Sequence, residues 1–348
     1  MNATFSFTVN SKQANTHLLA CLLPSIPYLK PEQWQSLLMN EQGDNDVQGH
    51  IKIDGVIVAD DVLLSIGQVV SYTINDYHEA EVDDAWSLIW SNAEIAAIHK
   101  PANLPVNRTT RNVYNTLIQL LRRESPWPDA HLLHRLDLET SGVMLIAQNK
   151  GIAKRYQAKL ENLIKRKIYR AVVFGKPDWE SKDFTCDLAT LDESQGGSAI
   201  RSQMHVVADG TGKSSHTKFK VLSTVDKALK NSANIRYSLI ECELFSGRKH
   251  QIRAQLAHLG HPIIGDKIYS NNGEFYLKRL QKTLTTIDHD KLLTPHHLLH
   301  AYEIHLHNLW GAEGTEDSGD SLEVESIETQ EIILRDEEFP ESWRDFSR

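Results

Sequence analysis

The chain has 348 residues, of which 41% are hydrophobic, and a formal net charge of −9. It lacks an 18-residue apolar run, and its N-terminus lacks a basic start followed by an apolar stretch, so we expect neither a membrane span nor a signal peptide, and a cytoplasmic protein. Cys21, Cys186 and Cys242 lie far apart in the sequence, which predicts three small core side chains rather than a zinc site or a disulfide framework.

The charges are distributed unevenly along the chain. Residues 100–309 hold 31 basic and 20 acidic side chains, a net charge of +11, whereas both flanking regions are acidic. Residues 1–80, for example, hold three basic and nine acidic side chains. Such asymmetry is typical of a protein that binds a polyanion, although a basic face is often merely solvated.

The sequence pattern of residues 1–80 predicts a small, separate module. The expected elements, in chain order, are a helix over 31–39, two short strands within 51–58 joined by a turn at Asp54-Gly55, and a strand over 69–74. Residues 75–86 are acidic and lack a strong apolar period, so they predict a linker before a larger domain at 87–348.

The larger domain shows many short strands with interspersed helices. The expected elements are a strand over 95–99, a helix over 113–121, a buried strand over 143–147, a basic helix over 152–167, a strand over 169–173 and hairpins within 178–236. This order favours a mixed α/β fold of the α+β type with a largely antiparallel sheet, and it does not favour regular βαβ winding.

Asp137 is the first candidate for a reactive group. It lies in the segment His134-Arg135-Leu136-Asp137, which turns through Thr140, Ser141 and Gly142 into the predicted apolar strand. A carboxylate on a loop that enters a buried strand is rigidly held. The alternative is an Asp that merely caps the turn.

Tyr169 and Arg253 are the next candidates. A Tyr in a strand can stack on a nucleic-acid base and still offer its hydroxyl, or it can simply pack in the core. Arg253 lies near the start of a predicted helix with a buried apolar face that ends at Gly260. A partly buried Arg needs an anionic partner, and we expect Asp137 to be that partner. The pair would keep the carboxylate ionised, unless it is only a structural salt bridge.

Taken together, these segments resemble the motifs of the RluA-like family of RNA pseudouridine synthases. The matching elements, in order, are His134-Arg135-Leu136-Asp137 with Thr140-Ser141-Gly142, Lys167-x-Tyr169-x-Ala171, Gly247-Arg248-x-His250-Gln251-Ile252-Arg253 and Gly260-His261-Pro262-Ile263-Ile264-Gly265-Asp266. Lys100-Pro101 and Leu299-His300-Ala301 add to the likeness, which spans about 95–345. Family members usually have Thr at Lys249 and His at Gln255, and these two departures are expected to alter contacts with RNA.

The resemblance implies a catalytic domain of the pseudouridine synthase type over 87–348. It implies isomerisation of specific uridines in ribosomal or transfer RNA, without a cofactor, by base flipping. Asp137 would be the catalytic carboxylate, Arg253 its ion-pair partner and Tyr169 the residue that stacks on the base. Residues expected to contact RNA are Arg135, Arg248, Lys249, His250, Lys154, Arg155 and Lys167, together with Lys100, Arg108, Arg111, Arg122 and Arg123 as candidates for phosphate contacts.

Residues 1–80 resemble a degenerate, acidic S4-type RNA-binding module, a helix pair followed by strands. True S4 modules are basic, so we do not expect this one to bind RNA strongly, because phosphate affinity comes from Lys and Arg. The acidic ends of the chain would instead suit a basic protein. The whole chain is expected to be a monomer that binds RNA and no membrane.

Several alternatives remain open at the level of sequence. The chain can be a catalytically idle RNA-binding protein on the same fold, or a different RNA-acting enzyme such as a glycosidase or nuclease. A nuclease usually needs several clustered carboxylates for metal ions, and this segment offers only Asp137 and Glu139. The histidines at 296, 297, 300, 305 and 307 have irregular spacing and no accompanying Cys, so we predict no metal site.

Overall fold

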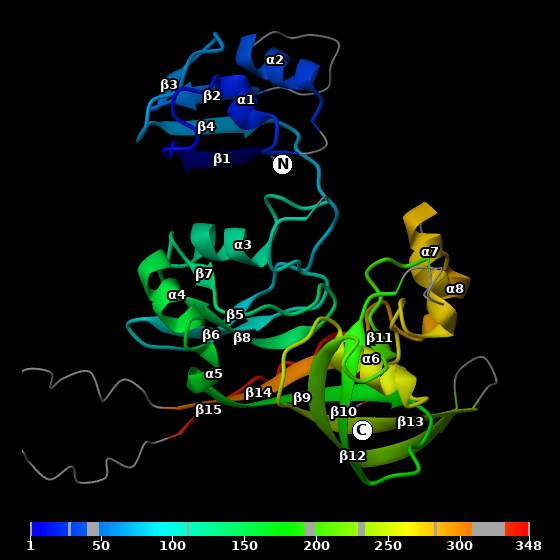
Figure 1. The fold of residues 1–348 in the computed structure, drawn as a ribbon. Helices are drawn as coiled ribbons and strands as arrows, with labels where there is room; N and C mark the ends of the chain where they lie inside the picture. The colour runs from blue at the N-terminus through cyan, green and yellow to red at the C-terminus, as the bar shows by residue number, and fades with distance from the viewer. Residues whose placement is uncertain are drawn as a thin grey trace, which may run out of the picture. The chain divides into compact units, whose positions relative to one another are not determined.

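The structure is a computed structural model that describes residues 2–26, 29–39, 49–109, 111–191, 199–228, 234–281, 284–307 and 331–346. It divides into two compact units (Figure 1). The first comprises Met1–Val82 and Asn107–Leu120, and the second comprises Asp83–Val106 and Leu121–Arg348. Most of the acidic C-terminal segment 310–348 lies outside the described residues.

The first unit is a four-stranded antiparallel sheet with two helices. Its elements are β1 (Ala3–Thr8), α1 (Leu18–Leu22), α2 (Pro31–Met39), β2 (Gly49–Ile53), β3 (Val56–Ile57) and β4 (Val69–Ile74), and the sheet order is β1-β4-β2-β3. Asp54 and Gly55 both have positive φ, at 51° and 82°, as the tight turn between β2 and β3 requires. The predicted α2, β2, β3 and β4 are confirmed, whereas β1 was not predicted.

Residues 107–120 belong to the first unit although they follow the start of the second in sequence. The carboxylate of Glu79 accepts hydrogen bonds from the backbone N–H groups of Val113, Tyr114 and Asn115. The ring of Tyr114 packs edge-on against Phe5, with the ring centroids 5.3 Å apart. These contacts tie the later segment to the sheet of the first unit.

The second unit is built on one large sheet. Its strands are β5 (Ser87–Ser91), β6 (Ile95–Lys100), β7 (His131–Leu132), β8 (Ser141–Ala147), β9 (Ile164–Phe174), β10 (Ser181–Ala189), β11 (His205–Val207), β12 (Lys213–Ala228), β13 (Asn234–Leu244), β14 (Leu299–Leu306) and β15 (Ile332–Arg335). Its helices are α4 (Lys150–Gln157), α5 (Leu160–Leu163), α6 (Gln251–His258), α7 (Glu274–Gln281) and α8 (Thr286–Leu292), with α3 (Leu117–Glu124) crossing the boundary between the units.

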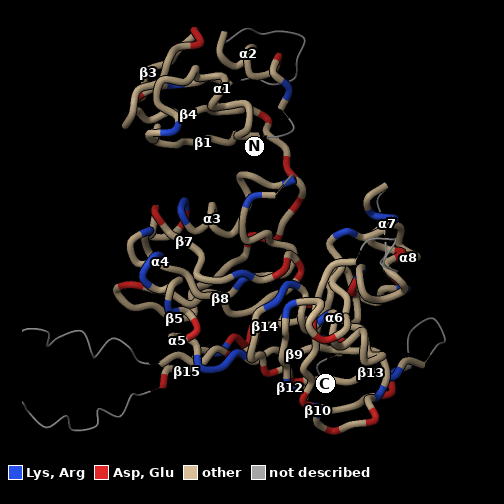
Figure 2. The backbone as a smooth tube through the Cα atoms, viewed as in Figure 1, with Lys and Arg blue, Asp and Glu red and all other residues tan. Residues whose placement is uncertain are grey.

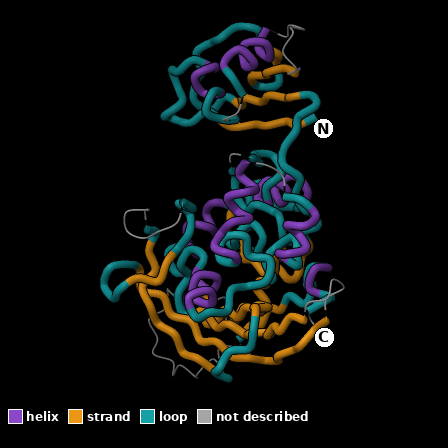
Figure 3. The backbone as a smooth tube through the Cα atoms, turned by 90° about the vertical axis from the view of Figure 1, so that its right-hand side faces the viewer, coloured by secondary structure: helices purple, strands orange, loops and turns teal. Residues whose placement is uncertain are grey.

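The main path through this sheet runs β11-β10-β12-β13-β9-β14-β8-β6-β5. Among the described strands, only β14 and β8 pair in parallel. Figure 3 shows the strands of this unit as a continuous curved layer, and Figure 1 shows α6 against the curved part that β9 to β13 form. The predicted mixed α/β class with a largely antiparallel sheet is confirmed, and the predicted hairpins appear as β10 to β13.

One predicted helix is wrong in its second half. The segment 152–167 forms α4 and α5, and the chain turns into β9 at Ile164. Lys165, Arg166 and Lys167 therefore lie on a strand, where β9 pairs with β14. The apolar residues between Ile152 and Leu163 follow a helical period in sequence, but pairing within the sheet outweighs this local signal for Lys165, Arg166 and Lys167. Figure 2 shows them as a run of basic residues at the start of β9.

The helix predicted around Arg253 is confirmed as α6. Gly260 follows its C-cap residue with a φ of +84°, and the backbone N–H groups of Gly260 and His261 bond to the carbonyls of Ala257 and Leu256. This pattern is a Schellman motif, which ends a helix at a glycine. Within the described part of the chain, no helix is long and apolar enough to cross a lipid bilayer.

Candidate active site

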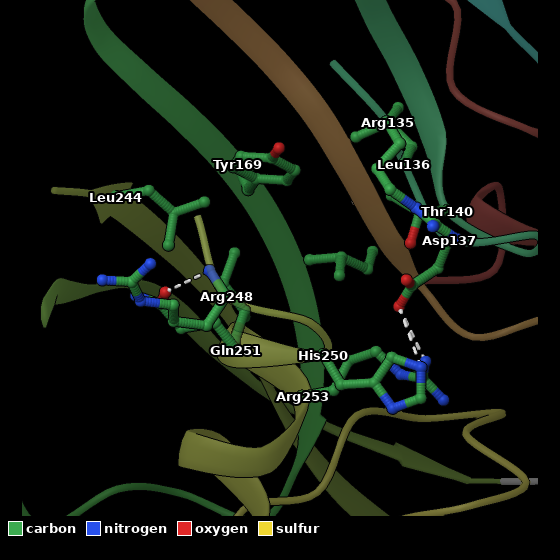
Figure 4. Close-up of a pocket in the computed structure, with 12 residues that line it drawn as sticks. Arg135, Leu136, Asp137, Thr140, Tyr169, Leu244, Arg248, His250, Gln251 and Arg253 are labelled. Atoms are coloured by element: carbon green, nitrogen blue, oxygen red, sulfur yellow. Dashed lines mark hydrogen bonds and ion pairs between the residues drawn. The ribbon is translucent and has the colours of Figure 1, made fainter. Parts of the chain in front are cut away.

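A pocket in the second unit contains the predicted reactive residues. Its empty volume is about 390 Å³, part of which is open to solvent. The residues that line it come from the loop before β8, from β9, β13 and β14, and from the start of α6; they are Arg135, Leu136, Asp137, Thr140, Tyr169, Leu244, Arg248, His250, Gln251, Ile252, Arg253 and Leu299 (Figure 4).

The loop that carries Asp137 is fixed at both ends. Before it, the backbone N–H of Leu145 in β8 donates to the ring of His134 at 2.9 Å. After it, the Thr140 N–H donates to the Asp137 carbonyl at 3.2 Å. Gly142 has a φ of +116°, and a Cβ atom there would lie 2.3 Å from the Ala301 carbonyl oxygen in β14. Only glycine permits this approach, so Gly142 lets the chain after Asp137 enter β8 in close contact with β14.

The predicted ion pair between Asp137 and Arg253 is present. The Nη1 atom of Arg253 donates to Oδ2 of Asp137 at 2.7 Å (Figure 4). Its Nε and Nη2 atoms donate to the two oxygens of Asp266 at 2.7 and 3.0 Å. The guanidinium of Arg253 is almost fully buried, and it bridges two carboxylates.

The charges around Asp137 keep it ionised. Burial by itself would raise the pKa of the Asp137 carboxyl, but the positive charge of Arg253 holds that pKa well below its usual range. Asp266 is fully buried, and the same guanidinium lowers its pKa. Arg253 in turn has its pKa raised by the two carboxylates, against the effect of its burial. The pocket therefore holds a rigid, anionic carboxylate at neutral pH.

A second buried ion pair supports the same loop. Lys267, which follows Asp266, donates to Oε1 of Glu139 at 2.7 Å, and Arg279 donates to the same oxygen at 3.1 Å. Burial would raise the pKa of Glu139, but His296 and Lys267 lower it well below the usual value. The adjacent residues Asp266 and Lys267 thus anchor Arg253 and the loop after Asp137.

Sequence reasoning assigned no role to Asp266, Lys267 or Glu139. One signal was available, because a buried guanidinium has five N–H donors and a single carboxylate cannot satisfy them. A second acceptor for Arg253 was therefore required, and Asp266 stands in the motif that follows Arg253 in sequence.

Tyr169 forms another wall of the pocket. It lies on β9, where its backbone pairs with Cys242 of β13 and with Ala301 of β14. Burial and the nearby negative charge of Asp137 raise the pKa of its hydroxyl, so the phenol is protonated at neutral pH. Figure 4 shows its ring across the pocket from the Asp137 side chain.

The residues predicted to contact RNA lie in different settings. Arg135, Arg248 and His250 line the pocket. Arg248 is exposed and donates through Nε to the Ser214 carbonyl at 2.9 Å. The remaining four, Lys154, Arg155, Lys167 and Lys249, do not line it. Lys154 and Lys249 are exposed, and Arg155 forms an ion pair with Glu94.

Two expectations about individual residues are wrong. Lys100 is fully buried and donates to the carbonyl oxygens of Pro101, Leu104 and Leu138, so it is not available to phosphate. Its burial lowers the pKa of its amine to about 7. Gln255 is also fully buried and accepts a hydrogen bond from Thr217 at 2.6 Å, so it supports the interior and offers no contact to RNA.

The histidines near the C-terminus have separate partners. His300 bonds to Ser141 at 2.8 Å, His297 bonds to Thr140 at 2.8 Å, and His305 lies against Glu303 and Glu331. Across the described ranges, no group of three or more His, Cys, Asp or Glu side chains is arranged to hold a metal ion.

Known proteins resemble this chain in sequence. A family model described as RNA pseudouridylate synthase matches residues 94–258. An uncharacterised RNA pseudouridine synthase from Synechocystis sp. is 31% identical over 228 residues, which cover 65% of this chain and 72% of that protein. The ribosomal large subunit pseudouridine synthase D of Neisseria meningitidis is 32% identical over 193 residues, which cover 54% of this chain and 46% of that protein.

The extent of these matches differs between relatives. The match to a human pseudouridylate synthase spans only 38% of that protein, at 28% identity. A solved human structure, RNA pseudouridylate synthase domain containing 1, aligns with 66% of this chain and 81% of its own length, at 20% identity and a TM-score of 0.47.

Proposed function

The chain belongs to the RluA-like family of RNA pseudouridine synthases, and we propose that it isomerises specific uridines of ribosomal or transfer RNA, with Asp137 as the catalytic carboxylate. The observation that carries this proposal is the Asp137–Arg253 ion pair in an open pocket that Tyr169 also lines. A carboxylate that is ionised, held at one oxygen and open to solvent is equipped to act on a substrate.

The reaction needs only the atoms of the uridine itself. The bond between C1′ and N1 breaks, the uracil turns, and C5 bonds to C1′. The proton that C5 loses balances the proton that N1 gains. Arg253 holds Asp137 ionised and oriented throughout, and Tyr169 stacks on the flipped base.

The uridine must leave its stack to reach Asp137. Arg135 is two residues from Asp137, is exposed and lines the pocket, which suits it to fill the gap that the flipped nucleotide leaves. Arg248, Lys249 and His250 at the start of α6, with Lys154, Arg155 and Lys167, then supply contacts to the RNA around that nucleotide.

The first unit is not proposed to bind RNA strongly. Its acidic composition makes it poorly suited to phosphate, so we assign RNA binding to the second unit and treat residues 1–80 as a degenerate S4-like module. The domain that performs catalysis extends over 87–348, apart from residues 107–120, which belong to the first unit.

The first prediction tests the carboxylate. The full chain is incubated with pools of ribosomal and transfer RNA, and pseudouridine is mapped before and after. We expect new pseudouridine at defined positions, and a rate at least about 100-fold lower for Asp137→Asn, which keeps the shape of the side chain but removes its charge.

Asp290→Asn on the exposed face of α8 is the matched control and should leave the rate unchanged. Equal activity of Asp137→Asn and the natural protein would contradict the proposal. RNA binding without any new pseudouridine would favour a catalytically idle RNA-binding protein.

A further inference from the structure

His250 lies between Asp137 and Tyr269. It is the N-cap residue of α6 and has a left-handed backbone, with a φ of 54°, which turns its ring into the pocket. Its Nδ1 atom lies 3.1 Å from the hydroxyl of Tyr269, and its Nε2 atom lies 3.8 Å from Oδ2 of Asp137. In Figure 4 the imidazole of His250 lies beside Arg253 at the end of the Asp137 side chain.

The hydrogen bonds of Tyr269 determine where the His250 proton sits. The Tyr269 hydroxyl oxygen accepts the backbone N–H of Met204 at 2.8 Å. If it also donates its own proton to Nδ1 of His250, the Tyr269 hydroxyl and Nδ1 are both satisfied and the ring proton is on Nε2. With the proton on Nδ1, the hydroxyl would accept twice and its own proton would lack a partner among the described residues. The Nε2–H form is therefore favoured, and Nε2 is the nitrogen that faces Asp137.

The two oxygens of Asp137 are in different situations. Oδ2 receives Nη1 of Arg253 and faces Nε2 of His250. Among the described residues, none forms a hydrogen bond with Oδ1. The hydrogen bond that holds the carboxylate is thus made at one oxygen, and the other oxygen of this pocket-lining residue accepts none from the described residues.

We propose that Tyr269 and His250 are positioning residues, in which Tyr269 fixes the His250 proton on Nε2, this N–H stabilises Oδ2 of Asp137, and Oδ1 is the oxygen that meets the uridine. This inference rests on the proposed function and deepens it. A separation of 3.8 Å is longer than a hydrogen bond, and such distances commonly shorten when a substrate closes the site.

The charge state of His250 makes the position of its proton important. Burial and the positive charge of Arg253 lower the pKa of the ring to about 3, against the effect of Asp137. A neutral imidazole has one N–H, so it can donate to Asp137 only in the Nε2–H form.

Nuclear magnetic resonance tests the proton position without any catalysis. The full chain is labelled with ¹⁵N-histidine, and the His250 signals are identified by their loss in His250→Gln. We expect the proton on Nε2 in the natural protein and a larger Nδ1–H fraction in Tyr269→Phe, which keeps the ring against His250 and Arg253. A proton on Nδ1 in the natural protein would overturn the inference.

Kinetics tests whether this proton matters to the reaction. Tyr269→Phe should lower kcat about five-fold with KM unchanged, the effect of losing one hydrogen bond. His250→Asn, whose amide reaches only the Nδ1 position, should lose roughly ten-fold in kcat, and His250→Gln, which carries an amide near the Nε2 position, should lose several-fold less than His250→Asn.

The double variant distinguishes positioning from simple packing. In the His250→Gln background there is no imidazole proton to fix, so Tyr269→Phe should cause no further loss. An equal loss in both backgrounds, or no loss in the natural background, would contradict the inference. If the natural protein modifies no RNA, the proposed function fails, while the resonance measurement still decides the position of the proton.

Discussion

Arg253 joins two carboxylates that would otherwise repel each other. It is nearly fully buried, and three of its nitrogens donate to Asp137 and Asp266. Because the fork on Asp266 fixes the plane of the guanidinium, it also fixes the direction of the Nη1–H that donates to Oδ2 of Asp137. The orientation of the proposed catalytic group thus depends on a carboxylate that does not line the pocket.

A lysine cannot reproduce this arrangement. We expect Arg253→Lys to lower kcat at least about 100-fold, since an ammonium group cannot bind Asp266 with two parallel bonds and still orient Asp137. The measurement is the rate of pseudouridine formation at saturating RNA. Arg248→Lys is the matched control, because Arg248 is exposed and the substitution preserves its positive charge. This variant should change KM and leave kcat within about three-fold. A normal kcat for Arg253→Lys would show that the fork is dispensable.

At the scale of residues, sequence identified the pair but not its surroundings. Asp137 and Arg253 could be predicted because one precedes a buried strand and the other needs an anion near a helix start. Asp266, Glu139 and Lys267 were missed because their roles depend on which loops the sheet brings together. The burial of Lys100 was missed for the same reason, since its three carbonyl partners lie on two separate segments of the chain.

At the scale of elements, His300 joins three segments. It lies in β14, bonds to Ser141 in β8 through Nδ1, and donates through Nε2 to the Asp336 carbonyl after β15. The side chain is fully buried, and burial lowers the pKa of the ring from 6.5 to about 4, against the effect of Asp336. His134 and His297 have their pKa lowered to about 4 by burial as well.

These histidines predict loss of stability in mild acid. Below pH 6.5 the unfolded chain binds protons that the folded rings do not, so the free energy of unfolding should fall as pH decreases from about 6.5 to 4. Each such ring contributes up to about 3 kcal/mol over this window. Denaturant unfolding at a series of pH values measures the slope.

His300→Gln should reduce that slope by about one proton, because its amide can keep the hydrogen bond that Nε2 makes to the Asp336 carbonyl and does not titrate. A matched substitution at a half-buried histidine, His131→Gln on β7, should reduce it much less. Stability that does not change between pH 6.5 and 4 would contradict the buried, neutral state of His300.

Sequence predicted elements well where periodicity was strong. The buried strand β8 and the helix α6 appear as expected, because an apolar run and a terminal glycine are local signals. The lengths of β9, β12 and β13 were not predictable, since a long strand is stabilised by partners distant in sequence. Pairing with a strand distant in sequence also explains why Lys165, Arg166 and Lys167 lie in β9 and not in the expected helix.

At the scale of the whole molecule, charge governs binding to RNA. Lys154 and Arg155 are adjacent and both exposed on α4, but Arg155 forms an ion pair with Glu94. We expect Lys154→Ala to reduce the slope of log affinity against log salt by roughly 0.7 to 0.9, whereas Arg155→Ala should change it less. Equal slopes for Lys154→Ala and the natural protein would exclude α4 from the RNA-binding surface.

The two units have separate cores. Leu37 is buried in the core of the first and Phe219 in that of the second. Leu37→Ala should destabilise the first unit by about 2 to 5 kcal/mol and leave the rate of pseudouridine formation unchanged at low temperature.

Phe219→Ala should lower the free energy of unfolding of the second unit by about 3 to 5 kcal/mol and lower the temperature at which activity is lost. Calorimetry measures both, and a single transition that shifts equally in both variants would contradict separate cores.

The segment 107–120 also determines the order in which the molecule can form during its synthesis. A ribosome releases the chain from its N-terminus, and a domain made of one continuous stretch can fold as soon as it emerges. Here Phe5 and Glu79 cannot form their contacts with Tyr114 until residues 107–120 have been synthesised. That segment emerges only after β5 and β6 of the other unit. The nascent first unit is therefore incomplete until residue 120 has left the ribosome, and the two units mature in an interleaved order rather than one after the other.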